Sequence, residues 1–122
     1  MKEGVILFAH GSRDPEWARP FEAISTSLAR RLPNAVVGIA YLEAMRPALP
    51  EAVAALASAG VRAIRVVPLF FGQGGHVKED LPRLVDTLQK AHPDLRIALA
   101  RPIGEDPAVI DAIAAVIARA VD

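Results

Sequence analysis

The sequence contains no cysteine among its 122 residues. This absence excludes disulfide scaffolds, zinc–thiolate sites and thiol nucleophiles, and it is compatible with a reducing compartment. The sequence also lacks a net charge, because 14 lysine and arginine residues balance 14 aspartate and glutamate residues. The overall charge therefore favours neither a nucleic acid nor an anionic membrane as a partner, and we expect neither.

Hydrophobic runs long enough to cross a bilayer are also missing, since such a run needs about 18 residues. The apolar stretch at residues 5–9 is too short for the core of a signal peptide. Hydrophobic residues nevertheless make up 52% of the chain and charged residues 23%, which excludes a disordered chain. A chain of this length corresponds to about one domain, so we expect a single soluble, cytoplasmic domain over residues 1–122.

Four short apolar runs alternate with four longer stretches of helical periodicity. The predicted strands cover residues 5–9, 35–42, 63–70 and 96–100. The predicted helices cover residues 15–32, 50–59, the stretch between the glycines at 72–75 and Pro93, and 107–121. The strands begin about thirty residues apart, the length of one βα unit. This alternation predicts an α/β fold of the flavodoxin-like topology class, with a four-stranded parallel sheet flanked by helices on both faces.

Chemically useful side chains follow three of the predicted strands. His10 follows the first strand, Glu43 follows the second, and His76 follows the third after the glycine-rich loop. In an open parallel α/β sheet, ligands bind outside the carboxyl ends of the strands, so we expect the three side chains to converge there. Two imidazoles and one carboxylate suit a divalent transition metal such as Co²⁺, Fe²⁺ or Ni²⁺.

Each of these residues also has an ordinary structural interpretation. His10 can cap its strand, Glu43 can be a solvated loop acid, and His76 can be a plain loop residue. The third histidine, His92, precedes a proline and is interpreted as a helix-end residue. Ser12 lies outside any G-x-S-x-G elbow, so we interpret it as a turn or capping residue rather than a nucleophile.

The glycines at residues 72–75 do not form a nucleotide-binding motif, because they match neither G-x-G-x-x-G nor the phosphate loop with GK[ST]. The two phenylalanines before them have different predicted places. Phe70 is expected in the core, whereas Phe71 is a candidate stacking surface for a flat aromatic ligand. Trp17 follows a helical apolar stripe and is also expected in the core. The last helix has so wide an apolar face that it either packs deeply or meets another chain.

Four stretches of the sequence form a set of motifs spread over the whole chain. They are residues 7–15 (LFAHGSRDP), 41–47 (YLEAMRP), 67–82 (VPLFFGQGGHVKEDLP) and 101–104 (RPIG). Together they resemble the short sirohydrochlorin cobaltochelatases, which are class II chelatases. The resemblance implies a chelatase-like fold and a lyase that inserts Co²⁺, Fe²⁺ or Ni²⁺ into sirohydrochlorin without ATP, in cobalamin or sirohaem biosynthesis. It implies no permanently bound cofactor, since the metal is a substrate.

The resemblance also implies roles for individual residues. His10 matches the family's metal ligand and proton acceptor, His76 matches its second metal-ligand histidine, and Glu43 matches an acid near the metal. The residues that match the lining of the macrocycle are Phe71, Gly72, Gln73, Gly74, Gly75, His76 and Arg46, and relatives can carry an acid at the last of these positions. Arg13, Arg46 and Lys78 flank the expected cleft and suit the carboxylates of the macrocycle.

A non-catalytic carrier of the metal or the tetrapyrrole, with the same fold, remains the alternative to an enzyme, and multiple turnover distinguishes the two. A flavodoxin-like phosphate binder is disfavoured, because no glycine-rich segment leads into the first helix. Relatives of this length pair as homodimers. The wide apolar face of the last helix also predicts a two-fold homodimer, in which two clefts open toward each other around the tetrapyrrole.

Overall fold

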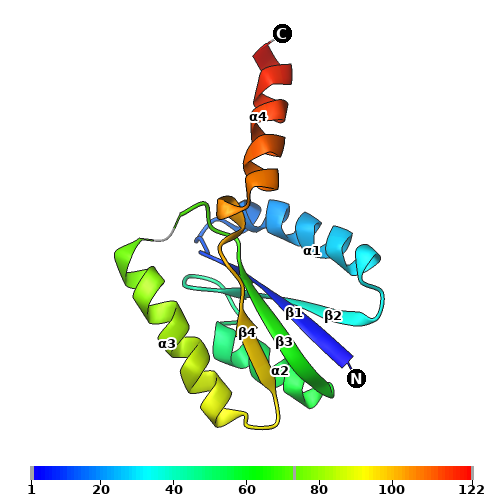
Figure 1. The fold of residues 1–122 in the computed structure, drawn as a ribbon, viewed down its shortest axis with the longest axis vertical. Coiled ribbons are helices and arrows are strands. Elements are labelled where there is room, and N and C mark those ends of the chain that lie inside the picture. The colour runs from blue at the N-terminus through cyan, green and yellow to red at the C-terminus, as the bar shows by residue number, and fades with distance from the viewer. Residues whose placement is uncertain (1, 73, 122) are drawn as a thin grey trace.

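The protein folds around one parallel β-sheet. The computed structural model describes residues 2–72 and 74–121. The strands are β1 (Lys2–Ala9), β2 (Ala35–Tyr41), β3 (Val61–Pro68) and β4 (Arg96–Leu99). They lie side by side in the order β2-β1-β3-β4 and are all parallel (Figure 1). This is the strand order of the flavodoxin-like class, so the predicted α/β fold is confirmed.

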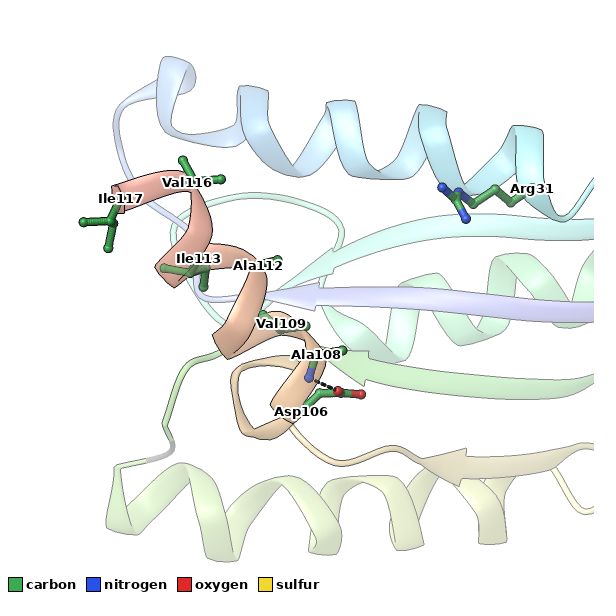
Figure 2. A pocket seen from close by; sticks show the side chains of 8 residues that line it. All are labelled: Arg31, Asp106, Ala108, Val109, Ala112, Ile113, Val116 and Ile117. Carbon is green, nitrogen blue, oxygen red and sulfur yellow. Dashed lines mark hydrogen bonds between the residues drawn. The ribbon is translucent and has the colours of Figure 1, made fainter. Parts of the chain in front are cut away.

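Helices flank both faces of the sheet. On one face lie α2 (Leu49–Ser58) and α3 (Gly75–Ala91). On the other face α1 (Arg19–Arg31) follows a short 3₁₀ turn, η1 (Pro15–Ala18), and contacts β2 and β1 (Figures 1 and 2). The chain then continues from β4 through a second 3₁₀ turn, η2 (Ile103–Glu105), into the last helix, α4 (Pro107–Val121).

The hydrophobic core fills the space between the sheet and the helices α2 and α3. Its larger members include Ile6, Phe8, Ile64 and Val66 from the strands, Leu49, Val53 and Leu56 from α2, and Leu81, Val85 and Leu88 from α3. Burial of each such side chain stabilises the fold by about 1.5–3 kcal/mol. The core therefore fixes the position of the central strands. The backbone at their carboxyl ends, where the candidate site residues lie, is fixed with them.

The first helix is less buried than the sequence predicts. The Asp14 side chain accepts a hydrogen bond from the Glu16 N–H at 3.0 Å, which caps the 3₁₀ turn and delays the α-helix to Arg19. Trp17, expected in the core, is half-buried and lies against Phe21 with ring centroids 4.5 Å apart. No described residue of α1 is fully buried.

The last helix, α4, projects away from the sheet (Figure 1). The Asp106 carboxylate caps its first turn by accepting from the Ala108 N–H at 2.8 Å. The helix contacts η2, and none of its residues from Pro107 to Val121 is buried. The wide apolar face is thus present, but it is not packed within this chain. In the part of the chain that the structure describes, no helix is both long and apolar enough to cross a membrane.

Candidate functional site

The carboxyl edge of the sheet places His10 and Glu43 side by side. Backbone hydrogen bonds continue from β1 to β2 beyond the strand ends, from the Leu42 N–H to the Ala9 carbonyl at 2.9 Å and from the Glu43 N–H to the His10 carbonyl at 3.0 Å. Because this pairing fixes both backbones, the side chains meet, with His10 Nε2 2.9 Å from Glu43 Oε1. Two of the three predicted site residues are therefore brought together.

The backbone around this pair has two positions with positive φ. Gly11 has a φ of 98°, and a Cβ atom there would collide with the Glu43 carbonyl oxygen. Only glycine combines this backbone conformation with so close an approach of the two segments. Ala44, with a φ of 65°, turns the chain directly after Glu43, and the Met45 N–H donates to the Glu43 carbonyl at 2.7 Å. The Glu43 backbone is thus held from both sides.

The His10–Glu43 pair is open to solvent and so to a substrate. The His10 side chain is 55% exposed and the Glu43 side chain 63% exposed. The tautomer of the imidazole decides whether Nε2 of His10 donates to Oε1 of Glu43. An exposed pair of this kind contributes little to stability. The contact between the two side chains can therefore break at a small cost in free energy. Each side chain is then free to bind a metal ion or a substrate proton.

Phe70 lies next to the imidazole of His10. The two rings meet edge to face, with centroids 6.4 Å apart and planes inclined by 68°. Phe70 is itself buried and packs against Phe8 with centroids 5.9 Å apart. The expectation that Phe70 belongs to the core is confirmed. Its contact with His10 was not predicted, because the sequence gives no sign of which side chain a strand-end ring touches.

His76 does not join the pair in this structure. It is the second residue of α3, which begins at Gly75, so it lies one loop beyond the end of β3 rather than at the strand end. Its side chain is exposed. Among residues 2–72 and 74–121 no group of three histidine or acidic side chains is close enough to hold a metal ion. Of the three side chains that we expected to converge, His10 and Glu43 are in contact in this structure.

The loop between β3 and α3 presents an open surface beside the pair. Phe71 is 72% exposed, in keeping with a stacking surface rather than a core residue. Cβ atoms added at Gly72, Gly74 or Gly75 would meet no atom within 4 Å. The backbone there is accessible to a broad, flat ligand. Gln73, another predicted substrate-binding residue, lies outside the described residues.

Gly104 in η2 contacts the start of this loop. Its N–H donates to the Phe70 carbonyl at 2.8 Å, and a Cβ atom at Gly104 would collide with the Phe71 backbone. Gly104 is buried, although it lies far along the chain from the loop that it contacts. The match of residues 101–104 to a family motif was the one sequence signal for this segment.

Three cations occupy the surroundings of the site. Arg13, Arg46 and Lys78 are exposed, and within the described part of the chain none of them has an ion-pair partner. Arg13 lies in a turn where the Asp14 N–H donates to Ser12 Oγ at 3.1 Å, which confirms Ser12 as a turn residue. These cations are available for the carboxylates of a ligand.

Tyr41 closes β2 directly before the functional segment. Burial raises the pKa of its phenol, and the Glu22 carboxylate acts in the same direction. The Tyr41 hydroxyl therefore stays protonated at neutral pH. Its ring lies 6.5 Å from that of Trp17, so the strand end that precedes Glu43 is packed under η1.

Comparison with known proteins identifies relatives along nearly the whole chain. Residues 4–120 match the family model described as CbiX. The chain is 36% identical over 109 residues to the sirohydrochlorin cobaltochelatase of Sulfolobus acidocaldarius, which covers 88% of this chain and 84% of that protein. It is 29% identical over 119 residues to the sirohydrochlorin cobaltochelatase of Methanosarcina acetivorans, with 92% of each covered.

Solved structures show the same fold. A cobalamin (vitamin B12) biosynthesis CbiX protein from Marinobacter aquaeolei matches with a TM-score of 0.85 and 35% identity, over 98% of this chain and 97% of that chain. The sirohydrochlorin chelatase SirB from Bacillus subtilis, solved in complex with cobalt, matches with a TM-score of 0.83 and 27% identity. That match covers 98% of this chain but 51% of SirB.

Proposed function

Because the chain belongs to the CbiX family, we propose that it is a sirohydrochlorin chelatase, a lyase that inserts Co²⁺ into the macrocycle without ATP. The observation that carries the proposal is the exposed His10–Glu43 pair, with His10 Nε2 2.9 Å from Glu43 Oε1, at the carboxyl edge of the sheet. Fe²⁺ and Ni²⁺ are further candidate substrates, since imidazole and carboxylate ligands accept all three ions. The product serves cobalamin or sirohaem biosynthesis.

His10 is the proposed proton acceptor. Metal insertion replaces the N–H protons of the pyrrole rings with bonds from their nitrogens to the metal, so a base must receive those protons. A neutral imidazole has one unprotonated ring nitrogen, which can bind a divalent metal or accept a proton, so the two roles of His10 follow one another. Glu43 stabilises the imidazolium that forms, because its carboxylate lies within hydrogen-bond distance of the ring. Each of the two protons then leaves to solvent, to which both side chains are open.

The metal ion is a substrate that must lose water before it enters the ring. We assign His10, Glu43 and His76 as its ligands during delivery. The support is that His10 and Glu43 are already paired and that His76 is exposed on the first turn of α3, after the next strand of the same sheet. In this arrangement the site holds no resident cofactor, and each metal ion leaves with its product.

The macrocycle is proposed to lie on the surface made by Phe71 and the glycine loop. A flat tetrapyrrole needs an apolar platform and close access to backbone N–H groups, and Phe71, Gly72, Gly74 and Gly75 offer both. The carboxylates of sirohydrochlorin would meet the cations that surround the platform, which are Arg13, Arg46 and Lys78.

We also propose a two-fold homodimer as the working form, located in the cytoplasm. The dimer is supported by the unpacked apolar face of α4, and the location by the cysteine-free sequence. In the dimer the two clefts open toward each other, and both chains enclose the tetrapyrrole.

Spectrophotometric insertion of Co²⁺ into sirohydrochlorin tests the function. An enzyme converts many equivalents of macrocycle, whereas a carrier stops at one. We expect multiple turnover by the native chain and its loss in His10→Ala. His92→Ala is the matched control, because His92 ends α3 at the opposite end of that helix from His76. Saturation at one equivalent would identify a carrier and refute the enzyme.

A further inference from the structure

Phe70 is a buried side chain at the carboxyl edge of the sheet, and the proposed mechanism gives it no role. It follows the end of β3 by two residues. Directly before it, the Leu69 N–H donates to the Phe8 carbonyl at 2.8 Å, which continues the pairing of β3 with β1 past the strand end. The backbone that leads into Phe70 is therefore held to the strand that leads into His10.

The ring of Phe70 contacts both the core and the proposed base. It packs edge to face against Phe8, which is 1% exposed, with ring centroids 5.9 Å apart. It also meets the imidazole of His10, with centroids 6.4 Å apart and planes inclined by 68°. Both pairs have the separation and tilt of favourable aromatic contacts. Because core packing fixes the ring of Phe70, His10 rests against a side chain that cannot easily move.

His10 needs this second contact for a single orientation of its ring. More than half of its side chain faces solvent, so few atoms confine it. The contact with Glu43 fixes the position of one ring atom, Nε2, but leaves the ring free to turn about that atom. The ring of Phe70 restricts this turning. Orientation matters for a base, because it must lie within hydrogen-bond reach of the proton that it receives.

The backbone of Phe70 connects the base to the surface proposed for the macrocycle. Its carbonyl accepts from the Gly104 N–H at 2.8 Å, which fixes this part of the chain to η2. The next residue is Phe71, the exposed ring on which the macrocycle is proposed to lie. Adjacent Cα atoms are about 3.8 Å apart, so Phe70 and Phe71 form a short link from His10 to the macrocycle.

We propose that Phe70 is a positioning residue for metal insertion. Its ring holds the imidazole of His10 in one place relative to a macrocycle bound on Phe71. This role rests on the proposed function and deepens it, since Phe70 acts through His10. Leucine or methionine at position 70 would fill much of the same volume, but neither has a flat ring to restrict the imidazole.

Phe70→Leu tests the role against a control of equal burial. Leu88→Ala also removes buried apolar volume, but Leu88 lies near the opposite end of α3 from His76. Both variants should lose stability, so rates are measured at a temperature where circular dichroism shows both folded. We expect kcat for Co²⁺ insertion to fall about tenfold or more in Phe70→Leu, because small displacements of a catalytic group are costly. The KM for the macrocycle should change little, since Phe71 is retained. Leu88→Ala should keep the native kcat and KM.

Two further measurements follow His10 without any turnover. The chain has three histidines, so the variants His76→Ala and His92→Ala assign their imidazole proton resonances. The aromatic ring of Phe70 shifts nearby protons, so Phe70→Leu should move the resonances of His10 and leave those of His92 in place. Titration with Co²⁺ alone should require about tenfold more ion to reach His10 in Phe70→Leu, as is usual when the support of a metal ligand is lost.

The outcomes separate this role from the proposed function. Multiple turnover by the native chain decides the function before any variant is compared, and the Co²⁺ titration tests Phe70 even in a carrier. Phe70→Met is the second variant if Phe70→Leu does not fold. A folded variant at position 70 with the native kcat, or with the native affinity for Co²⁺, would refute the positioning role. An equal loss of kcat in Leu88→Ala would refute it too, because weaker core packing would then be a sufficient cause.

Discussion

His10 and Glu43 are 33 residues apart in the chain, yet their side chains meet at 2.9 Å because β1 and β2 are adjacent. The pairing depends on backbone hydrogen bonds that continue past both strand ends. A base and a carboxylate are thereby held on a rigid sheet edge, with both side chains open to a substrate. Replacing either partner should alter the chemistry more than the stability, since exposed pairs contribute little to folding.

His10→Ala should reduce insertion of Co²⁺ by about 10²-fold or more, the usual contribution of a positioned general base. The free energy of unfolding should change by less than about 1 kcal/mol, because the His10 side chain is more than half exposed. Initial rates and urea unfolding measure the two effects. Retention of more than a tenth of the native rate would remove His10 from the mechanism.

Insertion should slow as the pH falls from 8 to 5. A protonated imidazole neither binds a metal ion nor accepts a proton, so both proposed roles of His10 disappear in acid. Initial rates at saturating metal and macrocycle, measured across this range, check the expectation. The stability of the fold at each pH should be followed by circular dichroism, so that unfolding is not mistaken for loss of the base. A flat rate in a folded protein would contradict the proposal.

His76→Ala should weaken the binding of Co²⁺ and slow insertion, while binding of the tetrapyrrole changes less. The residue is exposed on the first turn of α3, so its removal should leave the fold intact. Titration calorimetry with Co²⁺ measures the metal affinity, and quenching of the macrocycle's fluorescence measures its binding. The same affinity for Co²⁺ in the native chain and in His76→Ala would show that His76 is no ligand.

Gly104→Ala should displace the backbone of Phe71 and so disturb the surface on which the macrocycle is proposed to lie. A Cβ atom at position 104 would collide with the Phe71 backbone and approach the Phe70 carbonyl at 2.8 Å. We expect a loss of about 1–3 kcal/mol in stability, as for other overpacked sites, together with slower insertion. Gly72→Ala is the control, because a Cβ atom there meets nothing within 4 Å. Equal stability of the two variants would show that η2 does not support the loop.

The fold could be predicted from the sequence because its signals are local. Four apolar runs gave four strands, and each strand lies within three residues of its predicted start. The final helix was also placed correctly, since Asp106 caps it and Pro107 opens it. The periodicity of hydrophobic residues shows that a helix has an apolar face, but it does not show which other part of the protein packs against that face. The apolar side of α4 was evident in the sequence, but its departure from the sheet depends on η2, which contacts Phe70 through a glycine.

The site was predicted in part, for a related reason. The rule that ligands bind at the carboxyl edge of the sheet predicted His10 and Glu43, because each lies within two residues of the end of its strand. The same rule predicts His76 as their third partner, and that remains a prediction, because His76 lies one loop beyond β3 as the second residue of α3. The contact between Gly11 and the Glu43 backbone links two distant segments, and no local pattern reveals it.

Gly11→Ala tests whether that contact positions the pair. Gly11 and Gly60 both have positive φ, at 98° and 86°, so alanine at either position is strained by about 1 kcal/mol. They differ in their surroundings, because a Cβ atom at Gly60 meets nothing within 4 Å, whereas one at Gly11 collides with the Glu43 carbonyl oxygen. Gly60→Ala should therefore lose stability and keep its insertion rate. Gly11→Ala should lose more stability and also move Glu43 away from His10.

We expect insertion by Gly11→Ala to fall by more than tenfold, because displacements of about 1 Å in a catalytic group reduce rates by up to about 10²-fold. Initial rates, measured at a temperature where both variants remain folded, separate this effect from instability. His10 and Glu43 are unchanged in the Gly11→Ala chain, so a lower rate there reports their relative position alone. If Gly11→Ala and Gly60→Ala inserted Co²⁺ equally fast, the 2.9 Å pairing of His10 with Glu43 would not be required for the reaction.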